Sequence, residues 1–185
     1  VRDPLVVHWP AGITDRGGVR TQFHHVTDIT PTLLEIIGVT PPDSVNGVAQ
    51  QPIHGTSLAY SFAAEARNEP TRKPVQYFEM FGHRGIWAGG WKAVAFHKSG
   101  TSYDNDPWEL YHLETDFSES KDLALEKPEK LREMIELWWA EAGRNGVLPL
   151  DDRGPELWRP TPRIFNPRNR RRFVFHPPVS YLNSD

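Results

Sequence analysis

The hydrophobic residues near the start of the chain form one short run between prolines. This run, PLVVHWP, predicts a strand over residues 5–7 that is buried on both faces, as strands of parallel sheets are. The next apolar segment, TDITPTLLEIIGV, predicts a helix, with Thr27, Asp28 or Thr30 as its cap and Gly38 at its end. A strand and a helix of this kind form an α/β unit with too few strands to be complete, so further strands are expected from outside this chain. The buried side of the helix is expected to hold Leu33, Leu34, Ile36 and Ile37.

Polar and proline-containing segments follow this unit. Residues 41–52 are rich in Pro, Gly and Asn and predict a loop, whereas GTSLAYSFAAEA predicts a short helix capped at Thr56 or Ser57. The segment RNEPTRKP, residues 67–74, is polar and contains two prolines. We expect a subdomain boundary there.

Beyond residue 74 the apolar residues are spaced as in strands and then as in a helix. Four runs predict strands at 75–81, 84–88, 91–97 and 108–113, and GG between the second and third predicts a tight hairpin. The segment EKPEKLREMIELWWAEAGRNG predicts an amphipathic helix with Pro128 in its first turn. We expect a four-stranded antiparallel sheet with this helix packed on one face. The apolar stripe of the helix consists of Leu131, Met134, Ile135, Trp138 and Ala142.

Taken together, these segments predict an α/β fold in three parts. Residues 1–70 form the C-terminal part of an α/β domain, and residues 71–150 form a subdomain with the antiparallel sheet and the helix. Residues 151–185 form a tail rich in Pro and Arg that is expected to run along a surface.

Composition limits the classes of protein to be considered. With 185 residues, 38% hydrophobic and 24% charged, the chain resembles an ordinary soluble globular protein. A formal charge of −3 gives no reason to expect nucleic acid or an anionic membrane as a partner, and no run approaches the roughly 18 to 20 apolar residues of a spanning helix. There is no cysteine, which excludes disulfides, thiolate metal sites and a cysteine nucleophile within this chain. The chain begins at Val1, without a methionine or a signal-peptide pattern, as an internal fragment would.

The acidic segment ETDFSESKD, residues 114–122, raises the question of a metal site. A calcium loop of the EF-hand type needs a glycine at its sharp turn and ligands at fixed positions, and this segment has no glycine and the wrong spacing. Asp and Ser side chains often accept hydrogen bonds from nearby backbone amides instead. We predict that Asp116 and Glu119 turn the chain toward the long helix in this way, and we predict no metal site in this chain.

Histidine and arginine supply the candidate functional residues. His97 ends a predicted strand before a flexible loop, and His83 and Arg84 lie in the turn FGHRG, where side chains can reach into a cleft. These three residues are the candidates for lining a substrate site. The adjacent residues His24 and His25 point to opposite sides of an extended segment, so a surface or cap role is predicted for them.

Two other charged segments have structural interpretations. The basic run RNRRRF, residues 168–173, lies in the proline-rich tail without a nucleic-acid-binding fold around it, so it is expected to be solvated or packed on an acidic surface. Asp151 and Asp152 are adjacent, and the side chains of adjacent residues rarely converge on one atom. Arg153 offers them a partner for a salt bridge, so a structural role is predicted. The motifs of a serine elbow, a P-loop and a dinucleotide-binding turn are absent.

Taken in order, several segments resemble the type I sulfatases of the alkaline-phosphatase-like superfamily. VRDPLVVHWPAGI resembles the strand and turn written G-G-x-R-x-P-x-x-x-x-W-P in that family, and HHVTDITPTLLEIIGVTPP resembles the helix that follows. HGTSL resembles the G-x-S-L helix start, and WELYHLETDFSESKDLA resembles L-Y-x-L-x-x-D-x-x-E-x-x-D/N-L-A, in which the acidic residues form a turn. YFEMFGHRGIWAGGWKAV and NGVLPLDDR resemble the bacterial arylsulfatase branch.

The resemblance implies the C-terminal portion of an arylsulfatase, with residues 1–70 ending its α/β catalytic domain. Such enzymes hydrolyse sulfate esters with a formylglycine, made from the Cys or Ser of a C/S-x-P/A-x-R motif, and with a calcium ion held by Asp and Asn. This chain has neither that motif nor Asp-Asn-Gly ahead of VRDP. The resemblance therefore implies that nucleophile and calcium ligands lie in the N-terminal part of the same enzyme, and that this chain alone binds no cofactor and is inactive.

Two alternatives stay open beside this interpretation. The chain also fits part of a phosphate or phosphonate ester hydrolase of the same superfamily, with a different nucleophile upstream. It also fits a free-standing, non-catalytic binding module. Such a module is monodisperse and folds cooperatively alone, whereas a fragment cut through a sheet exposes an apolar edge.

Overall fold

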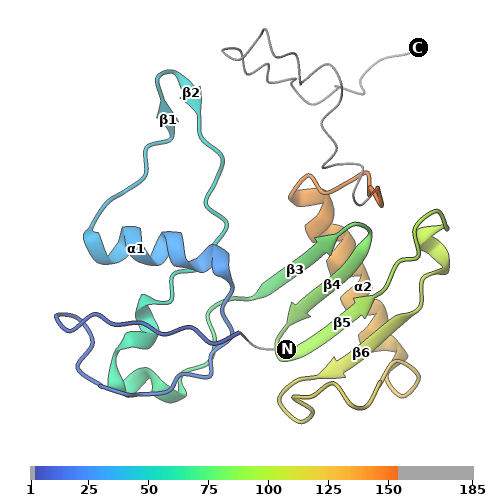
Figure 1. The fold of residues 1–185 in the computed structure, drawn as a ribbon, viewed down its shortest axis with the longest axis horizontal. Coiled ribbons are helices and arrows are strands. Elements are labelled where there is room, and N and C mark those ends of the chain that lie inside the picture. Colours follow the sequence, from blue (N-terminus) through green and yellow to red (C-terminus); the bar gives the residue numbers. More distant parts are fainter. Residues whose placement is uncertain (1–2, 154–185) are drawn as a thin grey trace, which may run out of the picture.

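The described part of the chain consists of a helical N-terminal unit followed by a sheet with a long helix on one face (Figure 1). The structure is a computed structural model, and it describes residues 3–153. The predicted tail, residues 151–185, and its basic run RNRRRF therefore lie almost wholly outside the described residues.

The sheet has four antiparallel strands in the order β3-β4-β5-β6. The strands are β3 Val75–Met80, β4 His83–Ala88, β5 Trp91–Ala95 and β6 Trp108–His112. Gly89 and Gly90 have φ angles of 53° and 82°, the left-handed values that a tight hairpin requires. The four predicted strands and the hairpin are confirmed, with ends that differ by one or two residues.

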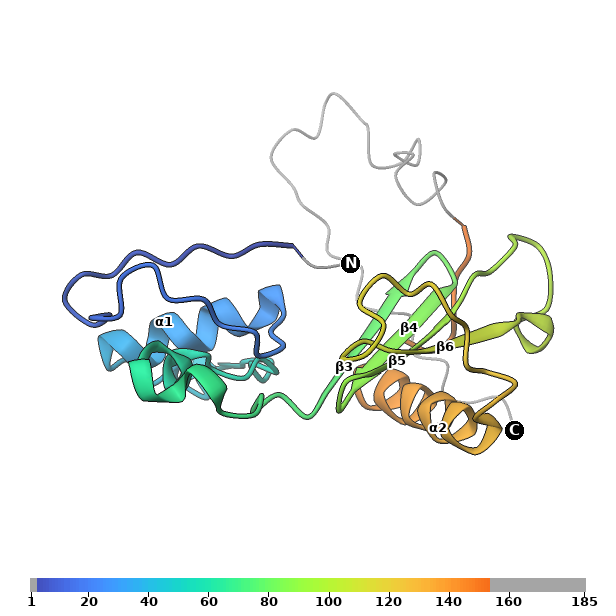
Figure 2. The same cartoon turned by 90° about the horizontal axis from the view of Figure 1, so that it is seen from below.

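The helix α2, Pro128–Arg144, lies along one face of this sheet (Figure 2). Its first residue is Pro128, as predicted, and the edges of its apolar stripe, Leu131 and Ile135, are half-buried. Trp138 Nε1–H donates a hydrogen bond to the Phe78 carbonyl at 3.0 Å, which fixes the helix to β3. The predicted packing of the helix on the sheet is confirmed. The fully buried core between the two consists of Ile86, Ala93, Leu110, Met134, Trp138 and Ala142.

The N-terminal unit contains one α-helix and several short elements. The helix α1, Ile29–Ile37, follows the 3-10 helix η1, Val26–Asp28, and ends at Gly38 with φ of 70°, as predicted. The predicted helix in GTSLAYSFAAEA is two 3-10 helices instead, η2 Ala59–Phe62 and η3 Ala64–Asn68. A last 3-10 helix, η4 Tyr103–Asn105, lies between β5 and β6.

The predicted loop over residues 41–52 contains a small hairpin. Its strands are β1 Ser44–Val45 and β2 Val48–Ala49, and they pair in an antiparallel register. Asn46 and Gly47 form the turn, with φ angles of 51° and 80°. The dipeptide NG is the sequence signal for such a turn, and it lies here inside a loop-like composition.

The predicted burial of α1 is wrong for Leu33 and Ile37, whereas Leu34 and Ile36 are half-buried. Leu33 and Ile37 are 52% and 64% exposed, whereas Thr32 is buried. The reason is a hydrogen-bonded chain: the Thr32 hydroxyl donates to the Asp28 carbonyl at 2.6 Å and accepts from the Leu58 amide at 2.9 Å. Thr32 therefore faces the rest of the described chain, whereas Leu33 and Ile37 point outward.

The predicted buried strand at residues 5–7, expected to join strands from outside this chain, does not form within the described chain. This segment is not a strand, and Val6 is 89% exposed. A strand is stable only in a ladder with a neighbour, and none of the strands within residues 3–153 pairs with it. Among those residues, moreover, no helix combines the length and the apolar character that crossing a bilayer requires.

Aromatic contacts join the N-terminal unit to the sheet. The Phe23 ring stacks on Trp87 with centroids 3.8 Å apart, and the His25 ring meets the Phe78 ring edge-on at 5.5 Å. Because side chains alternate along a strand and Ile86 belongs to the core under α2, Trp87 lies on the opposite face of the sheet. The N-terminal unit therefore contacts part of the sheet face that lies opposite α2.

Candidate functional site

A buried polar cluster lies where β4 begins and β5 ends. The strand register pairs Arg84 of β4 with Ala95 of β5, which brings His97 close to Arg84. Arg84 and His97 are only 3% and 7% exposed. Two of the three predicted site residues are therefore enclosed in the described chain.

Asp106 joins these two residues. Its Oδ2 accepts hydrogen bonds from Arg84 Nη2, at 2.5 Å, and from His97 Nδ1, at 2.8 Å. Because a carboxylate is only an acceptor, this contact places a proton on Nδ1 of His97. Asp106 was not among the residues predicted from the sequence, and its side chain is only 5% exposed.

Aromatic rings surround the Arg84 guanidinium. Its Cζ lies 5.0 Å from the ring centroid of Trp108 and 5.8 Å from those of Trp138 and Trp139. Nη2 also donates to the Tyr103 carbonyl at 3.1 Å. Cation–π attraction and the ion pair together hold the guanidinium in place on the α2 side of the sheet.

Tyr103 and the turn before β4 cover His97. The Tyr103 ring stacks on the His97 ring with centroids 4.0 Å apart and planes inclined by 21°. A side chain at Gly82, where φ is +87°, would place its Cβ 2.7 Å from His97 Cδ2. Burial, with added repulsion from nearby carboxylates, raises the pKa of Tyr103. Its buried hydroxyl has no hydrogen-bond partner among the described residues.

His83 differs from the other two candidates because its side chain is exposed. Its Nδ1 accepts a hydrogen bond from the His97 backbone amide at 3.0 Å. Its ring meets the Phe96 ring at a steep angle, with centroids 5.3 Å apart. The three predicted residues therefore lie together around His97, two of them buried and one at the surface.

The two adjacent carboxylates at the end of the described chain have different partners. Asp151 pairs with Arg153, as predicted, and this hydrogen-bonded ion pair lowers the pKa of Asp151 to about 2. Asp152 accepts from the Gly100 amide at 2.6 Å, which lowers its pKa, and its Oδ2 lies 3.5 Å from His97 Nε2. Asp152 thus closes the His97 cluster on the side opposite Asp106, a contact that no local sequence pattern indicates.

The acidic segment between β6 and α2 is a turn, as predicted. Asp116 Oδ2 accepts from the Lys121 amide at 2.8 Å, and this bond lowers the pKa of Asp116. Asp122 Oδ1 accepts from the Leu110 amide at 2.9 Å and so binds the turn to β6. Glu119, predicted to bind backbone amides, accepts two hydrogen bonds from Lys92 Nζ.

The carboxylates of the described chain do not fit a calcium site. Within residues 3–153, no group of three or more His, Asp or Glu side chains is placed to hold a metal ion. The carboxylates of the acidic turn and of the His97 cluster accept hydrogen bonds from amides and cationic side chains instead. No chemical step is therefore assigned to a metal held by these residues.

A second buried polar cluster surrounds Asp28. Its Oδ1 accepts from Lys73 Nζ at 2.7 Å and from the Thr56 amide at 2.8 Å, and its Oδ2 accepts from the His25 amide at 2.8 Å. The His25 ring also caps η1, as predicted. Burial lowers the pKa of the neighbouring His24. The cluster joins α1, the segment before η2 and the segment before β3.

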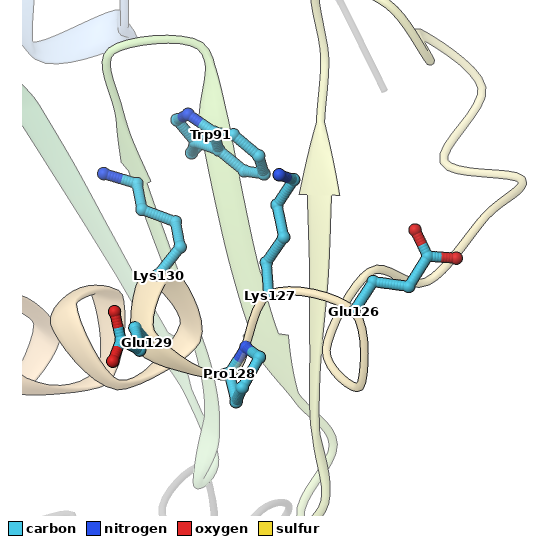
Figure 3. A pocket seen from close by; sticks show the side chains of 6 residues that line it. All are labelled: Trp91, Glu126, Lys127, Pro128, Glu129 and Lys130. Carbon is cyan, nitrogen blue, oxygen red and sulfur yellow. The ribbon is translucent and has the colours of Figure 1, made fainter.

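A shallow hollow of about 570 Å³ lies at the start of α2 (Figure 3). Lys130 Nζ lies 5.9 Å from the Trp91 ring centroid, and it also pairs with Glu133 at 2.7 Å. Trp91 begins β5, whereas His97 follows its end, so the hollow and the His97 cluster lie at opposite ends of this strand. The hollow is lined by Trp91, Glu126, Lys127, Pro128, Glu129 and Lys130.

Comparison with known proteins identifies the class to which this chain belongs. It is a member of the sulfatase family and corresponds to the C-terminal portion of such proteins. More specifically, residues 1–138 match the family described as N-sulphoglucosamine sulphohydrolase, C-terminal. The match includes the sheet and most of α2, and with them the whole His97 cluster except Asp152.

Two curated relatives are sulfatases. An uncharacterized sulfatase of Schizosaccharomyces pombe is 30% identical over 155 residues, covering 82% of this chain and 27% of the relative. A sulfatase of Formosa agariphila is 26% identical over 135 residues, covering 69% of this chain and 24% of the relative. The chain thus spans about a quarter of the length of the curated relatives it matches.

Two solved structures are similar at lower identity. One is a protein in complex with its substrate D-glucosamine-2-N,6-O-disulfate, with a TM-score of 0.46 and 22% identity over 68% of this chain and 25% of that chain. The other is Ps i-CgsB, with a TM-score of 0.47 and 21% identity over 71% of this chain and 27% of that chain.

Proposed function

We propose that this chain is the C-terminal part of an arylsulfatase that hydrolyses sulfate esters of aromatic alcohols. The observation that carries the proposal is the match of residues 1–138 to the C-terminal region of a sulfohydrolase family. The nucleophile, a formylglycine, and the calcium ion are proposed to belong to the N-terminal part of the same enzyme. The chain contains no cysteine, and within residues 3–153 no group of three or more His, Asp or Glu side chains is placed to hold a metal ion.

In this proposal, one of the three candidate residues contacts the substrate, and the other two hold the backbone around it. His83 is exposed and is the one that meets the substrate. Arg84 and His97 are buried around Asp106 and hold the strand ends that carry His83. This division follows from burial, because an enclosed side chain reaches a substrate only if the surrounding structure opens.

The outward apolar side of the N-terminal unit is proposed to pack against the N-terminal part of the enzyme. Val6, Leu33 and Ile37 are 89%, 52% and 64% exposed, and they lie on residues 5–7 and α1. Large apolar side chains gathered in one unit are typical of a covered interface. In the intact protein we expect these side chains to be protected from solvent.

The experiment that tests the proposed function is a comparison of substrates with the intact protein that contains this chain. We expect a higher kcat/KM for 4-nitrophenyl sulfate than for 4-nitrophenyl phosphate or a phenylphosphonate ester, and a formylglycine in the peptide mass map. A preference for the phosphorus esters would support the hydrolase alternative. Hydrolysis of none of them would leave a non-catalytic module.

A further inference from the structure

We propose that His83 and Phe96 form a subsite for the aromatic part of the sulfate ester, and that Asp106 is a positioning residue for this subsite. The inference rests on the proposed function, because it names the substrate class that the same surface recognises. It goes beyond that function by assigning a role to Phe96 and to Asp106.

The tautomer of His83 is fixed by a backbone contact. The His97 amide donates to His83 Nδ1 at 3.0 Å, and a backbone N–H is always a donor. Nδ1 therefore presents its lone pair, and in the neutral ring the proton lies on Nε2. The exposed ring thus offers a defined N–H donor, which matches an oxygen acceptor of a bound ester.

Phe96 supplies an apolar platform beside this donor. It is 72% exposed, and its ring is inclined by 63° to the His83 ring. Met80, the cross-strand partner of His83 in β3, is 65% exposed and extends the same row. An aromatic ring beside an N–H donor suits a planar ligand that carries oxygen acceptors, since aromatic groups stack on or meet such a ring edge-on.

Asp106 positions the subsite from beneath. Its bonds to Arg84 and His97 fix the backbone at the start of β4 and beyond the end of β5. His97 carries the amide that fixes His83, and it directly follows Phe96 in the chain. Loss of the Asp106 carboxylate is therefore expected to allow both tautomers of His83 and to let the Phe96 ring move.

The first measurement is the tautomer itself, in the intact protein labelled with ¹⁵N-histidine. Long-range ¹H–¹⁵N correlation spectra are expected to show His83 protonated at Nε2, and a mixture of tautomers in Asp106→Asn. The control Asp104→Asn changes an exposed carboxylate two residues away and is expected to leave the spectrum unchanged. A mixture of tautomers in the unmodified protein would overturn the positioning role without touching the proposed sulfatase activity.

The second measurement is kinetic and uses exposed residues whose substitution does not threaten folding. Phe96→Ala is expected to raise KM for 4-nitrophenyl sulfate about 2- to 10-fold, and to leave KM for an alkyl sulfate unchanged. His83→Ala is expected to lower kcat/KM about 10- to 100-fold for the aryl ester. The control His54→Ala removes an exposed histidine of the loop before η2 and is expected to change neither value.

The outcomes separate the inference from the function on which it rests. Unchanged constants in both variants, with sulfate hydrolysis intact, would overturn the subsite and leave the arylsulfatase proposal standing. Equal KM increases for aryl and alkyl esters in Phe96→Ala would overturn the assignment to an aromatic group. Failure of the unmodified protein to prefer sulfate esters would instead overturn the proposed function.

Discussion

Replacement of Lys73 by methionine is expected to destabilise the Asp28 cluster, which joins the N-terminal unit to the segment before β3. The Lys73 and Asp28 side chains are 3% and 0% exposed, and their charges lie 2.7 Å apart. Methionine fills much the same volume but leaves the Asp28 carboxylate buried without its cation. Breaking a buried ion pair from one side costs about 3–5 kcal/mol.

The cost is expected to be local, so hydrogen exchange measures it more directly than global unfolding. The Thr56 and His25 amides bind Asp28 directly, and they open when its environment is disrupted. At about 1.4 kcal/mol per factor of ten, a loss of 3–5 kcal/mol corresponds to exchange roughly 100- to 4000-fold faster at these amides. Deuterium uptake of the intact protein, resolved by mass spectrometry over residues 23–32 and 54–61, gives the rate.

A matched substitution at an exposed lysine separates the effect of breaking a buried ion pair from the effect of losing a lysine side chain. Lys130 makes an ion pair of the same length with Glu133, but this pair spans one turn of α2 and its side chains are 27% and 62% exposed. Such pairs contribute about 0.2–0.5 kcal/mol, so Lys130→Met is expected to change exchange less than about threefold. Equal effects of the two substitutions, or no effect of Lys73→Met at residues 23–32, would refute the reasoning.

Further predictions concern the His97 cluster, the acidic turn and the pH dependence of the stability that the Asp28 cluster contributes. Gly82→Ala is expected to lower Tm, because the added Cβ meets His97 at 2.7 Å at a φ of +87°. Tyr103→Phe is expected to leave Tm unchanged or raise it, since it removes a buried hydroxyl without a partner among the described residues and keeps the ring; a clear fall in Tm would reveal a partner. Asp122→Ala is expected to cost about 1–3 kcal/mol in urea unfolding, because it leaves the Leu110 amide unbonded. Burial tends to raise the pKa of Asp28, but the bonds from Lys73 and two amides outweigh it and hold that pKa below 3.8. Because its pKa is lowered in the folded protein, the ionised Asp28 carboxylate stabilises the fold above pH 3.8, and this contribution is lost as the pH falls through the folded-state pKa. Acid unfolding, followed by circular dichroism, should therefore begin at a lower pH in the unmodified protein than in the Asp28→Asn variant.

Local patterns predicted the C-terminal half of the described chain. Short apolar runs with aromatic residues mark β3 to β6, Gly89 and Gly90 determine the hairpin between β4 and β5, and α2 carries an apolar stripe that covers the sheet. These features depend on residues close in sequence. The pattern could not identify Asp106, because its partner Arg84 lies 22 positions away and reaches it only through the sheet register.

The N-terminal half shows what a local pattern leaves undetermined. An apolar helical face predicts burial, but in α1 Leu33 and Ile37 are exposed and Thr32 is the enclosed residue. Periodicity tells which residues share a face and not which neighbour covers it. The run at residues 5–7 has the same difficulty, since a strand depends on a partner that no described segment provides.

Several carboxylates of the described chain hold its backbone in place. Asp28 binds a lysine and two amides, and Asp106 binds an arginine and a histidine. Asp116 binds the Lys121 amide within the acidic turn, and Asp122 binds the Leu110 amide of β6. Each of these carboxylates therefore fixes the backbone, and the exposed rings of His83 and Phe96 lie beside the Asp106 cluster. A rigid support with exposed recognition groups is what a substrate-binding rim requires, because a subsite held by packed second contacts binds its ligand with little loss of conformational entropy.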